Sequence, residues 1–412
     1  MKQSVNNSPW PTVRLGEQVD LLAGFAFKSA RFTASPNDIP LVKGENVSQG
    51  RILWSISKRW PAKEGAQFSK FALKAGDVVL AMDRPWVPAG LKWAYIRERD
   101  PSALLVQRVA RLRGKNGLDS VFLRYIIGSP QFTDYVRPIT TGVNVPHISA
   151  KQIEDFQFHL PPLTAQREIA KILSAYDDLI ENNARRIKIL EEMSQSLYRE
   201  WFVRFRFPGH EMIKIIDSQV GKVPKGWEMK TLGSVAQEMR RNVRPDQIDP
   251  ETPYFGLEHL PRKSIALFDW GVANEVQSIK LRFEKGEILF GKIRPYFHKV
   301  SIAPISGVCS SDTIVMRPVA PEYLATVLCC VSSEDFVAHA TQTSQGTKMP
   351  RANWAVLKKY PLALPPGSLL EQFNAFVDDA VDEIQNLIFQ NRNLRHTRDL
   401  LLPKLISGEV GR

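Results

Sequence analysis

One stretch of the sequence imitates a phosphate-binding loop. Gly286-Glu287-Ile288-Leu289-Phe290-Gly291-Lys292 has the glycine and lysine spacing of a P-loop, whose backbone amides cradle phosphates. Ile293 follows, where a P-loop needs a Ser or Thr hydroxyl to bind Mg²⁺. The related stretch in the first half of the chain has Ala81 and Met82 in place of Gly291 and Lys292. We therefore predict a strand followed by a basic turn, not a nucleotide site.

Carboxylate and metal-ligand patterns are equally weak. Asp217 with Glu228-Met229-Lys230 has the spacing of a nuclease cluster, but such short patterns are common by chance. The seven histidines are scattered with no pair at metal-ligand spacing, so no metal site is predicted. Cys329 and Cys330 are adjacent within an apolar, helix-like run, and Cys309 has no recognisable base nearby in sequence. We predict that these cysteines are core residues.

The glycine and proline positions argue against methyl transfer. No two glycines are two positions apart, so neither a GxGxxG loop nor an F-x-G-x-G S-adenosylmethionine loop is present. The only Pro-Pro pairs, at 161–162 and 365–366, are flanked by Leu, which excludes an N-P-P-Y type motif. We predict no catalytic residues and no bound cofactor.

The composition describes a soluble globular protein with room for two to four domains. The chain has 412 residues, of which 43% are hydrophobic and 24% are charged. A net charge of +12 favours a polyanionic partner such as nucleic acid, although many basic proteins bind none. Three cysteines indicate a reducing cytosol, and no run of 18 apolar residues occurs, so we expect a cytoplasmic protein without a membrane partner.

Two long helices must position whatever the chain binds. After Leu160-Pro161-Pro162, about forty residues lack Gly and Pro until Pro208, which corresponds to a helix of roughly 60 Å. Apolar residues recur every seven positions, as in a coiled coil. A second such segment begins after Leu364-Pro365-Pro366, and each seam residue there lies 204 positions after its counterpart. The predicted seam comprises Ile169, Leu173, Tyr176, Ile180, Asn183, Ile187, Leu190 and Leu197 in the first helix, and Phe373, Val377, Ala380, Ile384, Leu387, Asn391, Leu394 and Leu401 in the second.

The direction of this pairing is open from periodicity alone. Antiparallel helices would place the two globular domains at opposite ends, whereas parallel helices would place them side by side. Asn183 and Asn391 occupy seam positions, where asparagine commonly fixes register at some cost in stability.

The whole chain is an internal repeat. Gly226-Trp227 follows Pro9-Trp10 by 217 positions, Gly286 follows Gly76 by 210, and Pro350 follows Pro146 by 204. The offset shrinks in one direction while the landmarks keep their order, as small deletions in one copy would produce. The predicted domains are residues 1–162, a central long helix over 163–207, residues 208–366 with a linker over 208–225, and a C-terminal long helix over 367–412.

These features resemble the specificity subunit of type I restriction–modification systems. The resemblance lies in the doubled Leu-Pro-Pro before each helix, the Trp201-Phe202 ending, the Gly…Pro loops at 142–146 and 346–350, and the final Leu401-Leu402-Pro403-Lys404-Leu405-Ile406-Ser407-Gly408. It implies an α+β protein with two pseudo-symmetric α/β target recognition domains separated by an antiparallel two-helix coiled coil. The implied partners are double-stranded DNA, two methyltransferase subunits, and motor/endonuclease subunits through them.

Basic and aromatic residues near the apolar strands are the candidates for DNA contact. Arg84 and Arg294 are favoured because both copies share them, each after an apolar strand and before a proline and an aromatic residue. Shared residues suit phosphate contacts, whereas residues that read bases should differ between the copies. The candidates are Lys43, Lys58, Arg59, Arg84, Trp86, Lys92 and His147 in the first domain, and Arg262, Lys263, Lys292, Arg294, Tyr296, Lys348 and Arg351 in the second.

Two other classes of function remain open from the sequence. One is a stand-alone DNA-binding or scaffolding protein of the same duplicated architecture, without methyltransferase partners. The other is an enzyme with an unrecognised site.

Overall fold

The computed structural model describes residues 9–87, 90–140, 146–218 and 221–409. It divides into two compact units, Met1–Asp178 with Arg395–Arg412, and Leu179–Leu394. Each unit therefore contains one globular domain together with parts of both long helices.

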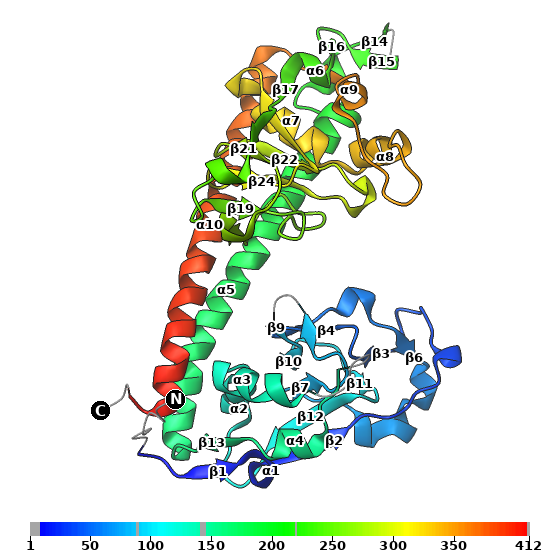
Figure 1. Cartoon of the computed structure of the whole chain (residues 1–412). Coiled ribbons are helices and arrows are strands. Elements are labelled where there is room, and N and C mark those ends of the chain that lie inside the picture. The colour runs from blue at the N-terminus through cyan, green and yellow to red at the C-terminus, as the bar shows by residue number, and fades with distance from the viewer. Residues whose placement is uncertain (1–8, 88–89, 141–145, 219–220, 410–412) are drawn as a thin grey trace. The chain divides into compact units, whose positions relative to one another are not determined.

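The first globular domain is built on a four-stranded antiparallel sheet of order β10-β7-β12-β2. A smaller, three-stranded sheet has the order β11-β3-β6, and β1 pairs with β13. The strands are β1 (Thr12–Arg14), β2 (Val19–Ala23), β3 (Ile39–Val42), β4 (Val47–Ser48), β5 (Arg51–Ile52), β6 (Arg59–Trp60), β7 (Val78–Ala81), β8 (Trp86–Val87), β9 (Gly90–Leu91), β10 (Trp93–Tyr95), β11 (Leu104–Leu105), β12 (Val109–Gly114) and β13 (Gln157–His159). Its helices are α1 (Leu15–Gln18), α2 (Ser120–Ile127), α3 (Pro130–Ile139) and α4 (Ala150–Glu154) (Figure 1).

The second domain repeats this arrangement with a sheet of order β23-β22-β25-β17 and a larger sheet, β18-β21-β24-β19-β20. Its strands are β14 (Ile215–Ser218), β15 (Gly221–Pro224), β16 (Glu228–Thr231), β17 (Ala236–Glu238), β18 (Arg241–Val243), β19 (Pro253–Phe255), β20 (Gly271–Val272), β21 (Lys280–Phe283), β22 (Ile288–Gly291), β23 (Val300–Ile302), β24 (Gly307–Cys309), β25 (Thr313–Pro318) and β26 (Pro361–Leu364). The helices are α6 (Leu232–Val235), α7 (Leu324–Val331), α8 (Glu334–Gln342) and α9 (Trp354–Leu357).

The two domains match element by element. Strand β7 corresponds to β22, β12 to β25, and the helix pair α2–α3 to α7–α8, in the same order along the chain. The parallel pair β3–β11 likewise corresponds to β19–β24. The stretch that imitates a P-loop is strand β22, in which Leu289 is fully buried, as predicted for a strand before a basic turn.

The long helices are α5 (Leu163–Tyr198) and α10 (Gly367–Ser407), and they pack antiparallel. In the first unit Asp177 contacts Arg398, and in the second Asn183 contacts Asn391 and Phe202 contacts Phe373. As residue numbers rise along one helix they fall along the other, which settles the direction that the heptads left open. Within each unit the two helices lie side by side in Figure 1.

The predicted seam residues differ in their degree of burial. Those that are buried are Ile169, Leu173, Asn183, Ile187, Phe373, Val377, Ala380, Ile384, Leu387 and Asn391. Those that are only partly buried are Tyr176, Ile180, Leu190, Leu197, Leu394 and Leu401. The Asn183 amide donates to Oδ1 of Asn391 at 3.0 Å, and the Asn391 amide donates to the Ile180 carbonyl at 3.2 Å. Asn391 therefore accepts from the other seam asparagine and donates to the backbone of the opposite helix.

Three local expectations differ from the structure. The α-helical part of α5 stops at Tyr198, and a π-helical turn, Arg199–Val203, precedes Phe205, whose φ of 56° is left-handed. The alternating apolar residues over 153–160 predict a strand, but the strand is confined to Gln157–His159, because Ile153 lies in the short helix α4. The link expected over 208–225 contains the antiparallel pair β14–β15.

Across the described residues, no helix is both long and apolar enough to span a membrane.

Candidate nucleic-acid interface

The two favoured arginines occupy the same unusual backbone position. We call Arg84-Pro85-Trp86 and Arg294-Pro295-Tyr296 the arginine turns. Both arginines have a left-handed φ, 44° and 49°. Each donates its backbone N–H to a proline carbonyl, Arg84 to Pro146 and Arg294 to Pro350, both at 2.7 Å. A left-handed backbone at a residue other than glycine costs about 1–3 kcal/mol and tends to persist at functional sites.

The guanidinium groups of these turns are not neutralised. Neither Arg84 nor Arg294 forms an ion pair with any carboxylate in the described part of the chain. Arg84 is exposed, whereas Arg294 is half-buried, with its guanidinium 5.9 Å from the Phe297 ring centre and 3.4 Å from the Lys348 carbonyl. An unpaired guanidinium held on a fixed turn suits a phosphate, which accepts two parallel hydrogen bonds from it.

A basic and aromatic cluster surrounds the second turn. Tyr296 is 50% exposed and packs edge-on against Phe297, with ring centres 4.9 Å apart. On Phe297 the Arg262 guanidinium stacks at 4.0 Å. Lys348 is exposed beside Arg294. Exposed aromatic rings flanked by cations are typical of surfaces that bind nucleic acid.

The side chains around the first arginine turn are different. Trp86 is half-buried and pairs with Leu91 in the β8–β9 ribbon, with the Arg137 guanidinium 5.4 Å from its ring centre. Nδ1 of His147 lies 2.5 Å from Asp83, which also pairs with Arg108 at 2.5 Å. The corresponding residue of the second domain, Arg351, instead pairs with Asp312 at 3.0 Å. The scaffold is shared, but the side chains beside each turn are not.

A lysine lies next to each turn, Lys92 buried and Lys299 half-buried. The carbonyl of Lys92 accepts from Ala81, and that of Lys299 accepts from Gly291, so the two lysines are structural counterparts. Burial lowers the pKa of both amines, and the nearby charge of Arg84 lowers that of Lys92 further. Lys92 is only 8% exposed. This candidate is therefore placed as a core residue beneath the turn, and we leave it out of the proposed contact set.

The remaining candidate residues for DNA contact differ in whether they already have a partner within the protein. Lys43 pairs with Glu45, Arg59 donates to the Asp38 carbonyl, and Lys263 pairs with Glu334. Lys58 is exposed and Lys292 half-buried, and neither forms an ion pair with a described residue. Residues 141–145 of the first Gly…Pro loop lie outside the described residues.

Sequence reasoning missed Arg108 and Phe297. Arg108 has a φ of 66° and reaches Asp83 from the end of a different strand segment, a contact that no local pattern signals. Phe297 follows Tyr296 directly, and only the fold reveals that it is the ring on which Arg262 stacks.

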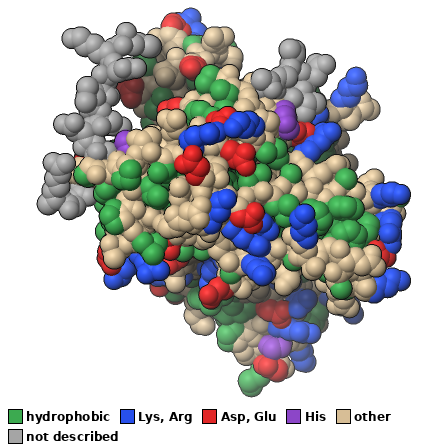
Figure 2. All heavy atoms as spheres, turned by 90° about the horizontal axis from the view of Figure 1, so that it is seen from below, with side chains coloured by type: hydrophobic (Ala, Val, Ile, Leu, Met, Phe, Trp, Pro, Cys, Tyr) green, Lys and Arg blue, Asp and Glu red, His purple; other side chains and the backbone are tan. Residues whose placement is uncertain are grey.

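The bulk charge does not by itself mark the interface. On the face shown in Figure 2, Lys and Arg side chains are mixed with Asp and Glu side chains. The location of a DNA surface therefore has to come from particular residues such as those of the arginine turns.

The described residues contain no group of three or more His, Cys, Asp and Glu side chains that could hold a metal ion. Cys309, Cys329 and Cys330 are all buried, and burial raises the pKa of the Cys309 and Cys330 thiols to about 12. Such thiols are protonated at neutral pH and make poor nucleophiles.

Comparisons with known proteins agree with this architecture. Residues 7–192 match the sequence model of the type I restriction modification DNA specificity domain. The type I restriction enzyme MjaIX specificity subunit of Methanocaldococcus jannaschii is 26% identical over 307 residues, which cover 72% of this chain and 70% of that protein. The EcoAI specificity subunit of Escherichia coli is 35% identical over 42% of this chain, but this match spans only 28% of that protein.

A crystal structure of the type I restriction–modification S subunit from M. genitalium has the same fold, with a TM-score of 0.59 at 15% identity and 98% coverage of both chains. The fold is thus the one seen in that structure, with two similar globular domains and two long helices. The chain is similar in sequence to type I restriction enzyme specificity subunits, in agreement with the resemblance seen in its motifs.

Proposed function

We propose that this chain is the non-catalytic specificity subunit of a type I restriction–modification complex that acts in the cytoplasm. Each globular domain binds one half of a bipartite target in double-stranded DNA. The long helices recruit two methyltransferase subunits, and motor/endonuclease subunits join through these. Helix length then sets the gap between the half-sites, in the way that dimer geometry sets half-site spacing in other DNA-binding proteins.

The repeated arginine turn is the observation that supports this proposal most strongly. The same residue type, left-handed backbone and proline carbonyl partner occur in both domains. A phosphate contact gives affinity and register without sequence information, so a shared contact suits two domains that bind different half-sites. Arg84 and Arg294 therefore anchor the two domains on the DNA backbone.

Sequence discrimination comes from the residues that differ around the turns. The second domain has Tyr296, Lys348 and the stacked Arg262, whereas the first has Trp86 and His147. Side chains of these types contact base edges in the grooves or stack on bases. Because the two sets differ, the two half-sites differ as well.

The proposal also accounts for apolar residues left exposed on α5. Leu179, Ile189 and Met193 are 53%, 53% and 47% exposed, although their helix already packs against α10. Exposed apolar side chains along a paired helix are a common feature of protein–protein interfaces. We assign this side of α5 to the methyltransferase subunits.

Co-expression with the methyltransferase encoded beside this gene tests the proposal. We expect a stable complex with two methyltransferases per chain, measured by native mass spectrometry, that binds duplex DNA. A chain that binds DNA but purifies without the methyltransferase would instead support the stand-alone DNA-binding or scaffolding protein. As a control, the variant Leu179→Lys/Ile189→Lys should bind DNA but lose the methyltransferases.

A further inference from the structure

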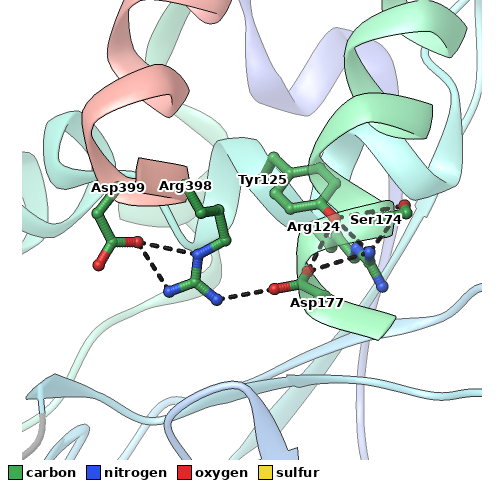
Figure 3. Close-up of polar contacts among 6 residues, drawn as sticks. All are labelled: Arg124, Tyr125, Ser174, Asp177, Arg398 and Asp399. Atoms are coloured by element: carbon green, nitrogen blue, oxygen red, sulfur yellow. Dashed lines mark hydrogen bonds and ion pairs between the residues drawn. The ribbon is translucent and has the colours of Figure 1, made fainter. Parts of the chain in front are cut away.

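One carboxylate joins the first globular domain to both long helices. Asp177 of α5 accepts hydrogen bonds from Arg124 at 3.2 Å and from the Tyr125 hydroxyl at 2.8 Å, both on α2. Its other oxygen accepts from Arg398 of α10 at 2.7 Å. Figure 3 shows Asp177 between the Arg398 side chain on one side and the Arg124–Tyr125 pair on the other. Three separate segments therefore meet at this one group.

The cluster is buried on the domain side. Arg124 is 6% exposed, and its guanidinium lies 4.8 Å from the Tyr95 ring centre and 2.9 Å from the Ser174 hydroxyl. Among the described residues, Asp177 is the only carboxylate that forms an ion pair with Arg124. A buried cation is strongly unfavourable without its counter-charge, so Arg124 depends on Asp177.

Tyr125 is held in its neutral, donating form. Burial and the nearby Asp177 charge raise the pKa of this phenol above its ordinary value. Its hydroxyl therefore donates to Asp177 at any physiological pH, which fixes the direction of this hydrogen bond.

The second domain meets the helices differently. The residues 204 positions after Arg124, Tyr125 and Asp177 are Leu328, Cys329 and Val381, all of which are buried. Ser194 stands in the place of Arg398, and its carbonyl lies 4.0 Å from the Cys329 thiol. Apolar residues thus occupy the positions of the ionic cluster, and the polar contacts of the second domain with α5 come instead from Glu191 and Gln195, neither of which bridges to α10 in these hydrogen bonds.

A carboxylate whose donors come from the domain and from α10 is satisfied in only one arrangement of these partners. We infer that Asp177 is a positioning residue. It fixes the orientation of the first recognition domain on α5 and α10, and so restricts the length of the gap between half-sites that the complex accepts. This inference rests on the proposed function.

The test compares Asp177→Asn with the wild type in the co-expressed complex with the methyltransferase. The substrates are duplexes whose half-sites are separated by the native gap or by one base pair more or less. We expect the variant to lose about tenfold in its preference for the native gap, the order of magnitude of one hydrogen bond to a charged group. Discrimination within each half-site should stay unchanged. The control is Asp178→Asn, the same change at an exposed neighbour on the same helix.

The outcomes separate the inference from the proposed function. A variant with lower thermal stability but an unchanged gap preference would overturn the inference and leave the function intact. A wild-type complex with no gap preference would overturn the proposed function before any variant is compared. If Asp177→Asn fails to fold, Arg398→Gln removes only the α10 partner, whose side chain is 28% exposed. An unchanged gap preference in that variant would overturn the inference equally.

Discussion

The two recognition domains share a backbone and differ in their side chains. Both have the same four-stranded sheet order and an arginine turn with the same backbone hydrogen bond. They differ beside the turn, where Arg262 stacks on Phe297 in one domain and His147 contacts Asp83 in the other. They also differ where they meet the helices: Asp177 joins the first domain to both α5 and α10, whereas Glu191 joins the second domain to α5.

This comparison separates what the fold requires from what a target requires. Features present in both copies serve the scaffold and the DNA backbone, since these are common to both half-sites. Features present in one copy are free to serve one half-site or one junction. The predictions below test this division, from the largest expected effect to the smallest.

Alanine substitutions at the two ends of the helix pair should destabilise the protein by different amounts. Phe373 is fully buried and packs on Phe202 at 4.6 Å between ring centres, whereas its counterpart Ile169 is 6% exposed and has a smaller side chain. We expect Phe373→Ala to cost about 3–5 kcal/mol and Ile169→Ala about 2–3 kcal/mol in the free energy of unfolding, measured in urea. Leu400→Ala, at a position that is 55% exposed, is the control. A cost for Phe373→Ala close to that of the control would contradict this packing.

The seam asparagines should act as a pair. Asn183→Leu leaves the Asn391 oxygen without its donor, so we expect a loss of about 1–3 kcal/mol. Replacing both residues with Leu should recover most of this loss, because no polar group then remains unpaired. A double-mutant cycle measures the coupling, and purely additive losses would show that the two amides act independently.

The arginine turns should contribute equally to DNA binding. Arg84→Ala and Arg294→Ala should each weaken binding and reduce the slope of log affinity against log salt by about one. The half-site preferences should remain, since phosphate contacts carry no sequence information. Arg185→Ala, an exposed position on α5, controls for net charge. A change in one half-site preference would mean that the arginine reads bases.

The free energy of unfolding should depend slightly on pH through Glu191, which lies on α5 where this helix contacts the second domain. This carboxylate accepts from the Ser264 hydroxyl and from the backbone N–H groups of Ile265 and Ala266, yet burial raises its pKa above the ordinary value of 4.5. The native state therefore holds the proton more firmly than the unfolded state. The resulting stability is present below pH 4.5 and is lost as the pH rises through the raised pKa.

Glu191→Gln keeps an acceptor oxygen and removes the charge, so it should remove this pH dependence and gain no more than about 1 kcal/mol at neutral pH. Urea unfolding at several pH values measures this difference. Glu168→Gln, an exposed position on the same helix, is the control. An unchanged slope of stability against pH in Glu191→Gln would refute this assignment.

Much of the fold follows from patterns visible in the sequence. The heptad positions of Leu173 and Ile384 and the stepwise offset between copies predict paired helices and a duplicated domain, because both are local or repeated signals. The same repetition singled out Arg84 and Arg294. The pairing direction did not follow from the heptads, since both directions bury the same seam.

Other features depend on contacts between distant segments. Arg124, Asp177 and Arg398 come from α2, α5 and α10, and no spacing rule connects them. The Lys92 carbonyl accepts a hydrogen bond from the Ala81 N–H, and this pairing places Lys92 against a buried strand. Only the register of the sheet reveals this position. The π-helical turn after Tyr198 similarly reflects tertiary packing of an aromatic helix end, where helix propensity gives no signal.

Mapping of methylated bases in the host genome tests the central claim most directly. With this gene present, we predict one methylated bipartite motif with a fixed gap, and its complete loss when the gene is deleted. Replacing only the first globular domain should change one half of that motif. Persistence of the motif after deletion, or a change in both halves after the replacement, would contradict the account.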